Sequence, residues 1–240
     1  MNYIFLVAGK GARLQPLTFS TPKSQYKLDK NTTILQRMIS KIYKFDKEAK
    51  FVVVGGYLYD YIISGLENIP NIEFLYNPFY DVTNSIASLW FAKDFMDGEV
   101  VIINGDIVVE EALVKEIICD KEVTRPLVLV DSSIKSDGDY NVQVFDERVL
   151  VMSKNLDSYF GEYAGITKLD KKSVLLLRDK VEKMIKNGMY DQWYENAIVQ
   201  MIFDEDFLLY YKDICSYKWT EVDCVSDMLL ARMIHNSENL

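Results

Sequence analysis

Short apolar runs alternate with amphipathic segments through the first hundred residues. The runs have the length and composition of strands buried on both faces of a sheet, and they cover residues 3–7, 51–54, 72–76 and 100–103. Between them, a capping box formed by Thr33 and Gln36 predicts the start of one helix, and Asn84 predicts the start of another. Because strand and helix alternate, we expect an α/β fold built from right-handed βαβ units, with a mainly parallel sheet flanked by helices.

The second half of the chain has a different pattern. Strand-like segments joined by short polar turns, such as Ser136 to Asp139, cover residues 126–131, 141–145, 149–153 and 160–167. We expect these strands to extend the sheet with antiparallel pairs. The remaining predicted elements are helices over residues 173–187, 190–201 and 226–235, and a short strand over residues 217–222. No composition break divides the chain, so residues 1–240 are expected to form a single domain.

Composition narrows the classes of function. The net charge of −9 argues against nucleic acid and anionic membranes as partners. His235 is the only histidine, and the sequence places it in a polar tail, which excludes histidine-based triads. Three cysteines without a CxxC pair indicate a reducing, cytoplasmic setting. No apolar run approaches the ~20 residues of a membrane span, and the N-terminal strand has no signal-peptide features.

A loop suited to phosphate follows the first strand, in the segment Ala8-Gly9-Lys10-Gly11-Ala12-Arg13, with Pro22-Lys23 further on. The two glycines let backbone amides approach a phosphate, while Arg13 supplies a planar fork of donors and Lys23 a point charge. Leu14 stands where the dinucleotide motif GxGxxG needs glycine, and Ile4 stands where the P-loop needs its first glycine. The alternative is an ordinary strand-to-loop turn with solvated charges.

Two aspartates are the candidate metal ligands. Asp106 and Asp223 each follow a strand-like run, so their carboxylates are expected to converge and to hold Mg²⁺. The alternative for each is a turn former or a helix cap. Glu221 is expected to lie outside the metal's immediate ligands or at the surface.

The segment from Ala8 to Arg13, followed by eight residues and Pro22-Lys23, resembles the nucleotidyltransferases that activate sugar 1-phosphates, and their choline-phosphate relatives. Ala12 departs from the threonine or serine usual in that family. The resemblance implies a mixed sheet with a Rossmann-like N-terminal half, the nucleotide-diphospho-sugar transferase type. It also implies Mg²⁺ bound at Asp106 and Asp223. On this basis residues 1–110 form a nucleotide-binding half and residues 111–240 an acceptor-binding half.

Residues 77–89 resemble the cytidylyltransferase subgroup, which implies CTP as the donor. The expected nucleotide contacts are Ala8, Gly9, Gly11, Ala12, Arg13, Lys23, Gly56, Tyr57, Asn84, Ser85 and Ser88. For the last three, an ordinary helix cap is the alternative. Aromatic and acidic residues in the second half are candidates for a cationic acceptor: Glu162, Tyr190 and Trp193, with Tyr140, Tyr163, Asp191 and Glu195 beside them. For any one of these, a place in the core is the alternative.

The resulting hypothesis is a CTP-dependent cytidylyltransferase. An acceptor phosphate, already ionised, attacks the α-phosphorus without a general base, and pyrophosphate leaves. Lys23, Arg13, Asp106 and Asp223 are the expected catalytic residues. The favoured acceptor is phosphoglutamine, which implies capsule biosynthesis, with phosphocholine or aminoethylphosphonate as alternatives. A sugar-1-phosphate enzyme using UTP or dTTP and a non-catalytic nucleotide-binding module are the rival functions. A homodimer stays open.

Overall fold

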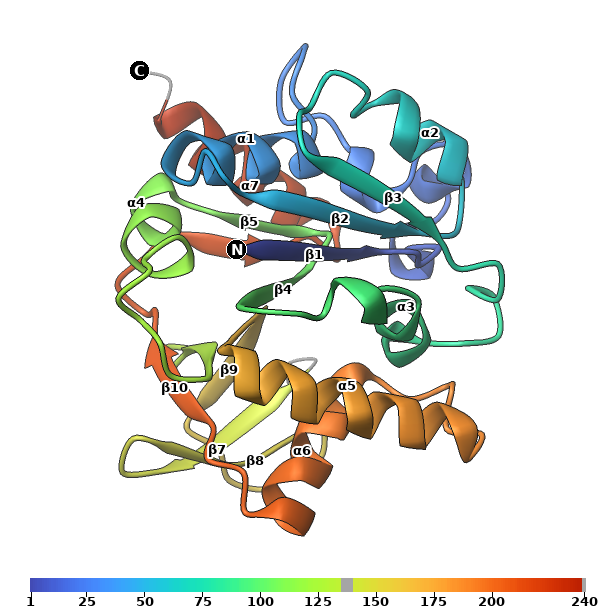
Figure 1. Cartoon of the computed structure of the whole chain (residues 1–240). Coiled ribbons are helices and arrows are strands. Elements are labelled where there is room, and N and C mark those ends of the chain that lie inside the picture. Colours follow the sequence, from blue (N-terminus) through green and yellow to red (C-terminus); the bar gives the residue numbers. More distant parts are fainter. Residues whose placement is uncertain (135–139, 239–240) are drawn as a thin grey trace.

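The computed structural model describes residues 1–134 and 140–238 (Figure 1). The predicted turn from Ser136 to Asp139 therefore lies outside the described residues. The strands are β1 (Asn2–Val7), β2 (Lys50–Gly55), β3 (Ile72–Tyr76), β4 (Val100–Asn104), β5 (Ile107–Val109), β6 (Leu127–Asp131), β7 (Asn141–Phe145), β8 (Arg148–Ser153), β9 (Gly161–Leu169), β10 (Tyr210–Asp213) and β11 (Trp219–Glu221). The helices are α1 (Ile34–Phe45), α2 (Tyr59–Ser64), α3 (Ser85–Phe91), α4 (Glu111–Leu113), α5 (Lys171–Lys186), α6 (Tyr194–Glu205) and α7 (Val225–Ser237).

In the described part of the chain, nine strands form one mixed sheet in the order β3-β2-β1-β4-β9-β6-β10-β8-β7. The first four in this order are parallel, as the alternating pattern predicts. Odd positions of β1, such as Tyr3 and Phe5, pack with α1 on one face, and Ile4 packs with α3 on the other. Figure 1 shows α1 and α2 on one side of β1 and α3 on the opposite side. Burial on both faces explains the unbroken apolar runs.

The antiparallel extension is also present. Strand β9 runs antiparallel to β4 and β6, and β7 pairs with β8 in the same sense. Strand β10 was not predicted. It is short, lies only partly buried, and runs parallel to β6. Within residues 1–134 and 140–238, no helix combines the length and the apolar composition that a membrane span requires.

Two local predictions need correction. The helix expected from residue 190 begins at Tyr194, because the carbonyls of Tyr190 and Gln192 accept hydrogen bonds from the amides of Asn84 and Ile86 instead of entering a helix. The polar tail expected around His235 is wrong. His235 lies on the buried face of α7, only 6% exposed, and its Nε2 is 2.7 Å from Asp29 Oδ2.

Candidate active site

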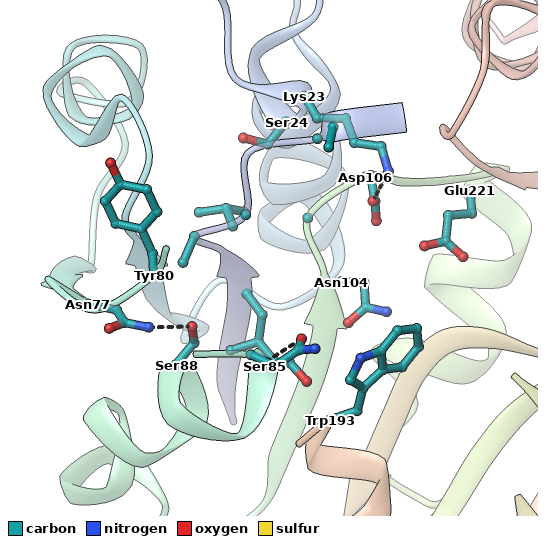
Figure 2. Close-up of a pocket in the computed structure, with 18 of the residues that line it drawn as sticks. Lys23, Ser24, Asn77, Tyr80, Ser85, Ser88, Asn104, Asp106, Trp193 and Glu221 are labelled. Carbon is teal, nitrogen blue, oxygen red and sulfur yellow. Dashed lines mark hydrogen bonds and ion pairs between the residues drawn. The ribbon is translucent and has the colours of Figure 1, made fainter. Parts of the chain in front are cut away.

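A cavity of about 510 Å³ opens at the carboxyl ends of β1 and β4, where a parallel sheet is expected to bind its ligand. Figure 2 shows Lys23 and Asp106 on one side of this cavity, Asn77 and Tyr80 on another, and Trp193 across from them. The lining residues are Leu6, Val7, Ala8, Gly9, Gly11, Ala12, Arg13, Lys23, Ser24, Asn77, Tyr80, Thr83, Asn84, Ser85, Ser88, Asn104, Gly105, Asp106, Tyr140, Tyr163, Trp193, Glu195 and Glu221.

The glycine loop after β1 forms one wall of the cavity. Gly11 has φ of +62°, a conformation in which a side chain is strained, and its carbonyl accepts a hydrogen bond of 2.9 Å from the Thr18 hydroxyl. A Cβ on Gly9 would meet no protein atom within 4 Å, so packing inside the protein does not require glycine there. The open space in front of Gly9 is suited to the close approach of a ligand phosphate.

Gly56 and Tyr57 do not line the cavity, and both lie against the carbonyl of Ala8 in the glycine loop. The amide of Tyr57 donates to the carbonyl of Ala8 over 3.0 Å. A Cβ on Gly56 would come within 2.9 Å of the same carbonyl. The structure therefore places these two residues where they support the loop.

Four charged side chains contact one another beside the glycine loop. Lys23 Nζ lies 2.6 Å from Asp106 Oδ2 and also bonds Asp223 Oδ1. Arg13 Nη1 lies 2.9 Å from Asp223 Oδ2. All four residues that the sequence analysis expects to be catalytic are thus brought together.

Burial and charge act in opposite directions on this cluster. Burial lowers the pKa of Lys23, but the charges and hydrogen bonds of Asp106 and Asp223 outweigh it, so the Lys23 pKa is raised. Burial raises the pKa of Asp223, and the attraction of Lys23 opposes that rise. Lys23 therefore stays cationic and available to a phosphate oxygen at neutral pH.

Strand pairing explains how Asp106 and Asp223 meet although they are distant in sequence. Strand β11 is not part of the main sheet, and it pairs antiparallel with β5. The amide of Val222 then donates to the carbonyl of Asp106 over 3.0 Å. Gly105 lets β4 approach β1, since a Cβ there would lie 2.1 Å from Val7. Asp106 and Asp223 therefore lie close together, as expected, and the pairing of β5 with β11 brings them there.

The carboxylates fit a divalent metal. Single oxygen atoms of Asp106, Glu221 and Asp223 lie within 4.8 Å of one another. Asp106 Oδ1 is buried and has no hydrogen-bond partner among the residues described, so one ligand atom is uncommitted. Hard oxygen donors are the set that Mg²⁺ prefers. Glu221 lies beside the two aspartates and lines the cavity, which places it closer to the expected metal than the sequence suggested.

The start of α3 forms the wall opposite the charged cluster. Ser88 Oγ accepts a hydrogen bond from Asn77 Nδ2 over 3.2 Å, and Ser85 Oγ accepts one from the amide of Tyr194. The Asn84 side chain caps the amide of Ser85. Asn84, Ser85 and Ser88 therefore reach the cavity as expected, but part of their bonding capacity holds the wall together.

The candidate acceptor residues divide into two groups. Trp193 lines the cavity, as do Tyr140, Tyr163 and Glu195. The other candidates do not: Glu162 is partly buried on β9, while Tyr190 and Asp191 are exposed, Tyr190 by 49%. Burial raises the pKa of Glu195 to about 8. The acceptor side of the cavity is thus an aromatic wall with one buried carboxylate.

Sequence reasoning missed several lining residues, including Ser24, Tyr80 and Asn104. Asn104 is the last residue of β4, two residues before Asp106, so its place at a strand end could have indicated that it lines the site. Lys10 forms an ion pair with Asp81, which joins the glycine loop to the loop after β3. That contact joins two distant segments, and no local pattern in the sequence indicates it.

Solved structures similar to this chain show its fold class. The structure is similar to a solved CTP:phosphocholine cytidylyltransferase from Streptococcus pneumoniae, with a TM-score of 0.81, 19% identity, and coverage of 98% of both chains. That likeness confirms the predicted fold class.

The sequence relatives define the family. A family model described as nucleotidyl transferase matches residues 2–148. A bifunctional protein GlmU from Methanocaldococcus jannaschii is 33% identical over 210 residues, covering 85% of this chain and 48% of that protein. A CTP:phosphoglutamine cytidylyltransferase from Campylobacter jejuni is 35% identical over 139 residues, covering 55% and 53%. The chain belongs to the nucleotidyl transferase family, and it spans about half the length of these curated relatives.

Proposed function

We propose that this protein is a CTP-dependent cytidylyltransferase that transfers CMP to a small phosphorylated acceptor and releases pyrophosphate. The observation that carries the proposal is the cluster of Lys23, Arg13, Asp106 and Asp223 at the mouth of the glycine loop. A module that only binds nucleotide needs no cluster of carboxylates there. The similarity to a CTP:phosphoglutamine cytidylyltransferase supports both the base and the favoured acceptor, phosphoglutamine, and with it a role in capsule biosynthesis.

The roles of the residues follow from their positions. The amides of the loop at Gly9 and Gly11 bind the triphosphate, and Arg13 adds donors at its exposed side. Lys23 binds the phosphate at which charge develops, and its protonated state requires no partner base. The acceptor phosphate is ionised at neutral pH, so the side chains orient it for in-line attack and need not remove a proton.

Asp106 and Asp223, with Glu221 beside them, are the residues that would hold Mg²⁺. When bound, the ion neutralises charge on the phosphate oxygens. The carboxylates themselves position Lys23, because both aspartates bond its ammonium group.

Free cysteines fit a reducing compartment, which supports a cytoplasmic location.

Pyrophosphate release tests the proposal directly. The protein is incubated with Mg²⁺, one of CTP, UTP, dTTP or ATP, and one acceptor from phosphoglutamine, phosphocholine, aminoethylphosphonate and glucose 1-phosphate. We expect release with CTP and a non-sugar acceptor. Release only with UTP or dTTP and the sugar phosphate would replace the proposal with a sugar-1-phosphate nucleotidyltransferase. Binding of CTP without release in any pair would indicate a non-catalytic module.

A further inference from the structure

Glu195 has no role in the proposed transfer, yet burying its carboxyl group is energetically unfavourable. It lies in the first turn of α6, is 3% exposed, and lines the cavity. Its Oε2 atom is buried and receives no hydrogen bond from the part of the chain that the structure describes. A buried carboxylate oxygen without a donor is strongly disfavoured. The N-terminus of a helix favours negative charge, but this effect offsets only part of the cost.

The hydroxyl groups around Glu195 are bonded elsewhere. Tyr140 donates its hydroxyl hydrogen to Asn196 Oδ1. The hydroxyl oxygens of Tyr163 and Tyr194 lie 2.5 Å apart, and that of Tyr163 lies 2.7 Å from Thr167. These tyrosines therefore form the wall around the carboxylate without supplying its missing donor. Lys154 acts on Glu195 through its charge, but Oε2 receives no hydrogen bond from the described residues, so the missing donor has to enter the cavity, and a ligand with an N–H group can supply it.

Trp193 shows which kind of cation fits. Its ring stacks on Tyr140, with centroids 5.4 Å apart and planes inclined by 26°. Lys154 Nζ lies 3.5 Å from the Trp193 centroid. Two stacked rings at that spacing leave no room for an ammonium group between them, so Lys154 covers the opposite face. Because Tyr140 and Lys154 already pack on Trp193, little of its aromatic face is left for a quaternary ammonium group.

We propose that Glu195 binds a primary ammonium group of the acceptor, so that the enzyme selects phosphorylated or phosphonate primary amines over quaternary amines and sugar phosphates. The inference rests on the proposed nucleotidyl transfer to the extent that the bound amine is its acceptor. Burial raises the pKa of Glu195 to about 8, so in the ligand-free protein the carboxyl group is protonated at neutral pH. A bound ammonium favours release of that proton, because it supplies the carboxylate with a hydrogen-bond donor and an opposite charge. Lys23 and Glu195 line the same cavity, so a cation suited to phosphate and a carboxyl group suited to an amine share one binding space.

Phosphoethanolamine and phosphocholine provide a matched test, because they differ only in three N-methyl groups. Equilibrium binding of each is measured by calorimetry, and turnover with CTP is measured by pyrophosphate release. We expect phosphoethanolamine to be favoured at least about tenfold in both, since a buried group built to accept a hydrogen bond discriminates against a ligand that lacks the donor. Equal or tighter binding of phosphocholine would overturn the inference.

The variant Glu195→Gln keeps the shape of the side chain and removes its ability to ionise when an ammonium binds. It is expected to reduce the affinity for phosphoethanolamine about tenfold or more and to abolish the preference over phosphocholine. Asp204→Asn, an exposed change near the other end of α6, is the control and should leave both affinities unchanged. An unchanged preference in Glu195→Gln would refute the role of Glu195. Absence of pyrophosphate release, with the binding preference intact, would count against the proposed function alone.

Discussion

The buried carboxylate of Glu195 predicts that removing its charge makes the protein more stable at high pH. Burial raises the pKa of Glu195 from 4.5 to about 8. Each pH unit of such a displacement corresponds to about 1.4 kcal/mol, so ionising Glu195 in the folded protein costs about 5 kcal/mol. That amount is a large share of the stability of a typical domain.

The direction in which stability changes with pH follows from the number of protons bound by the folded and the unfolded protein. Between pH 4.5 and about 8 the ligand-free folded protein keeps the Glu195 proton, whereas the unfolded chain releases it. Stability from this group is therefore fully present below pH 4.5 and is lost as the pH rises through 8. The tyrosines that face Glu195, Tyr140, Tyr163 and Tyr194, have raised pKa values through burial and stay neutral in this range, and Lys154 is the cation whose field acts on it.

Glu195→Gln does not titrate, so its stability relative to the wild type should change with pH. Urea unfolding at pH values of about 4.5, 6.5 and 9 measures both proteins. We expect nearly equal stability at the lowest pH and a gain of up to about 5 kcal/mol for the variant at the highest. Asp204→Asn, which changes an exposed carboxylate, should show no such trend. A difference between wild type and Glu195→Gln that stays constant across the pH range would refute the reasoning.

Three further changes test the site. Lys23→Ala should lower turnover by about a thousandfold or more, because it removes the buried cation at the reacting phosphate; near-normal pyrophosphate release would contradict its role. Asp223→Asn should weaken Mn²⁺ binding, followed by electron paramagnetic resonance, about tenfold or more, and unchanged binding would remove Asp223 from the metal site. Gly11→Ala should destabilise the fold by about 1–2 kcal/mol in thermal unfolding, because φ is +62° and Thr18 Cγ2 lies 3.0 Å from the added methyl; an unchanged melting temperature would show that the loop relaxes.

Local sequence patterns were sufficient for much of the fold and for one wall of the site. Residues 51–54 and 100–103 are apolar throughout because both faces of their strands are covered, and that signal is present in the sequence itself. The glycine loop and Lys23 lie within one short segment, so their spacing indicated a phosphate site. Asp106 and Asp223 each follow a strand-like run, so their convergence was also predictable.

Features that depend on contacts distant in sequence were not predictable in the same way. The pairing of β5 with β11 brings Glu221 beside Asp106, and a strand of three residues carries too little pattern to reveal it. His235 was misplaced because its partner, Asp29, lies 206 residues away along the chain. The carbonyl of Tyr190 likewise accepts a hydrogen bond from the amide of Asn84, the residue before α3, so α6 begins later than expected.

The net charge of the site also explains why Lys23 and Arg13 alone are not enough to attract a triphosphate. With a net charge of −9, the protein needs a local basic site to attract phosphate. Lys23 and Arg13 supply a formal charge of +2, but Asp106, Glu221 and Asp223 supply −3, which leaves −1 at the mouth of the loop. A divalent cation changes that sum to +1. Binding of CTP should therefore depend on the metal even before any chemistry occurs, since the carboxylates that position Lys23 also cancel its charge.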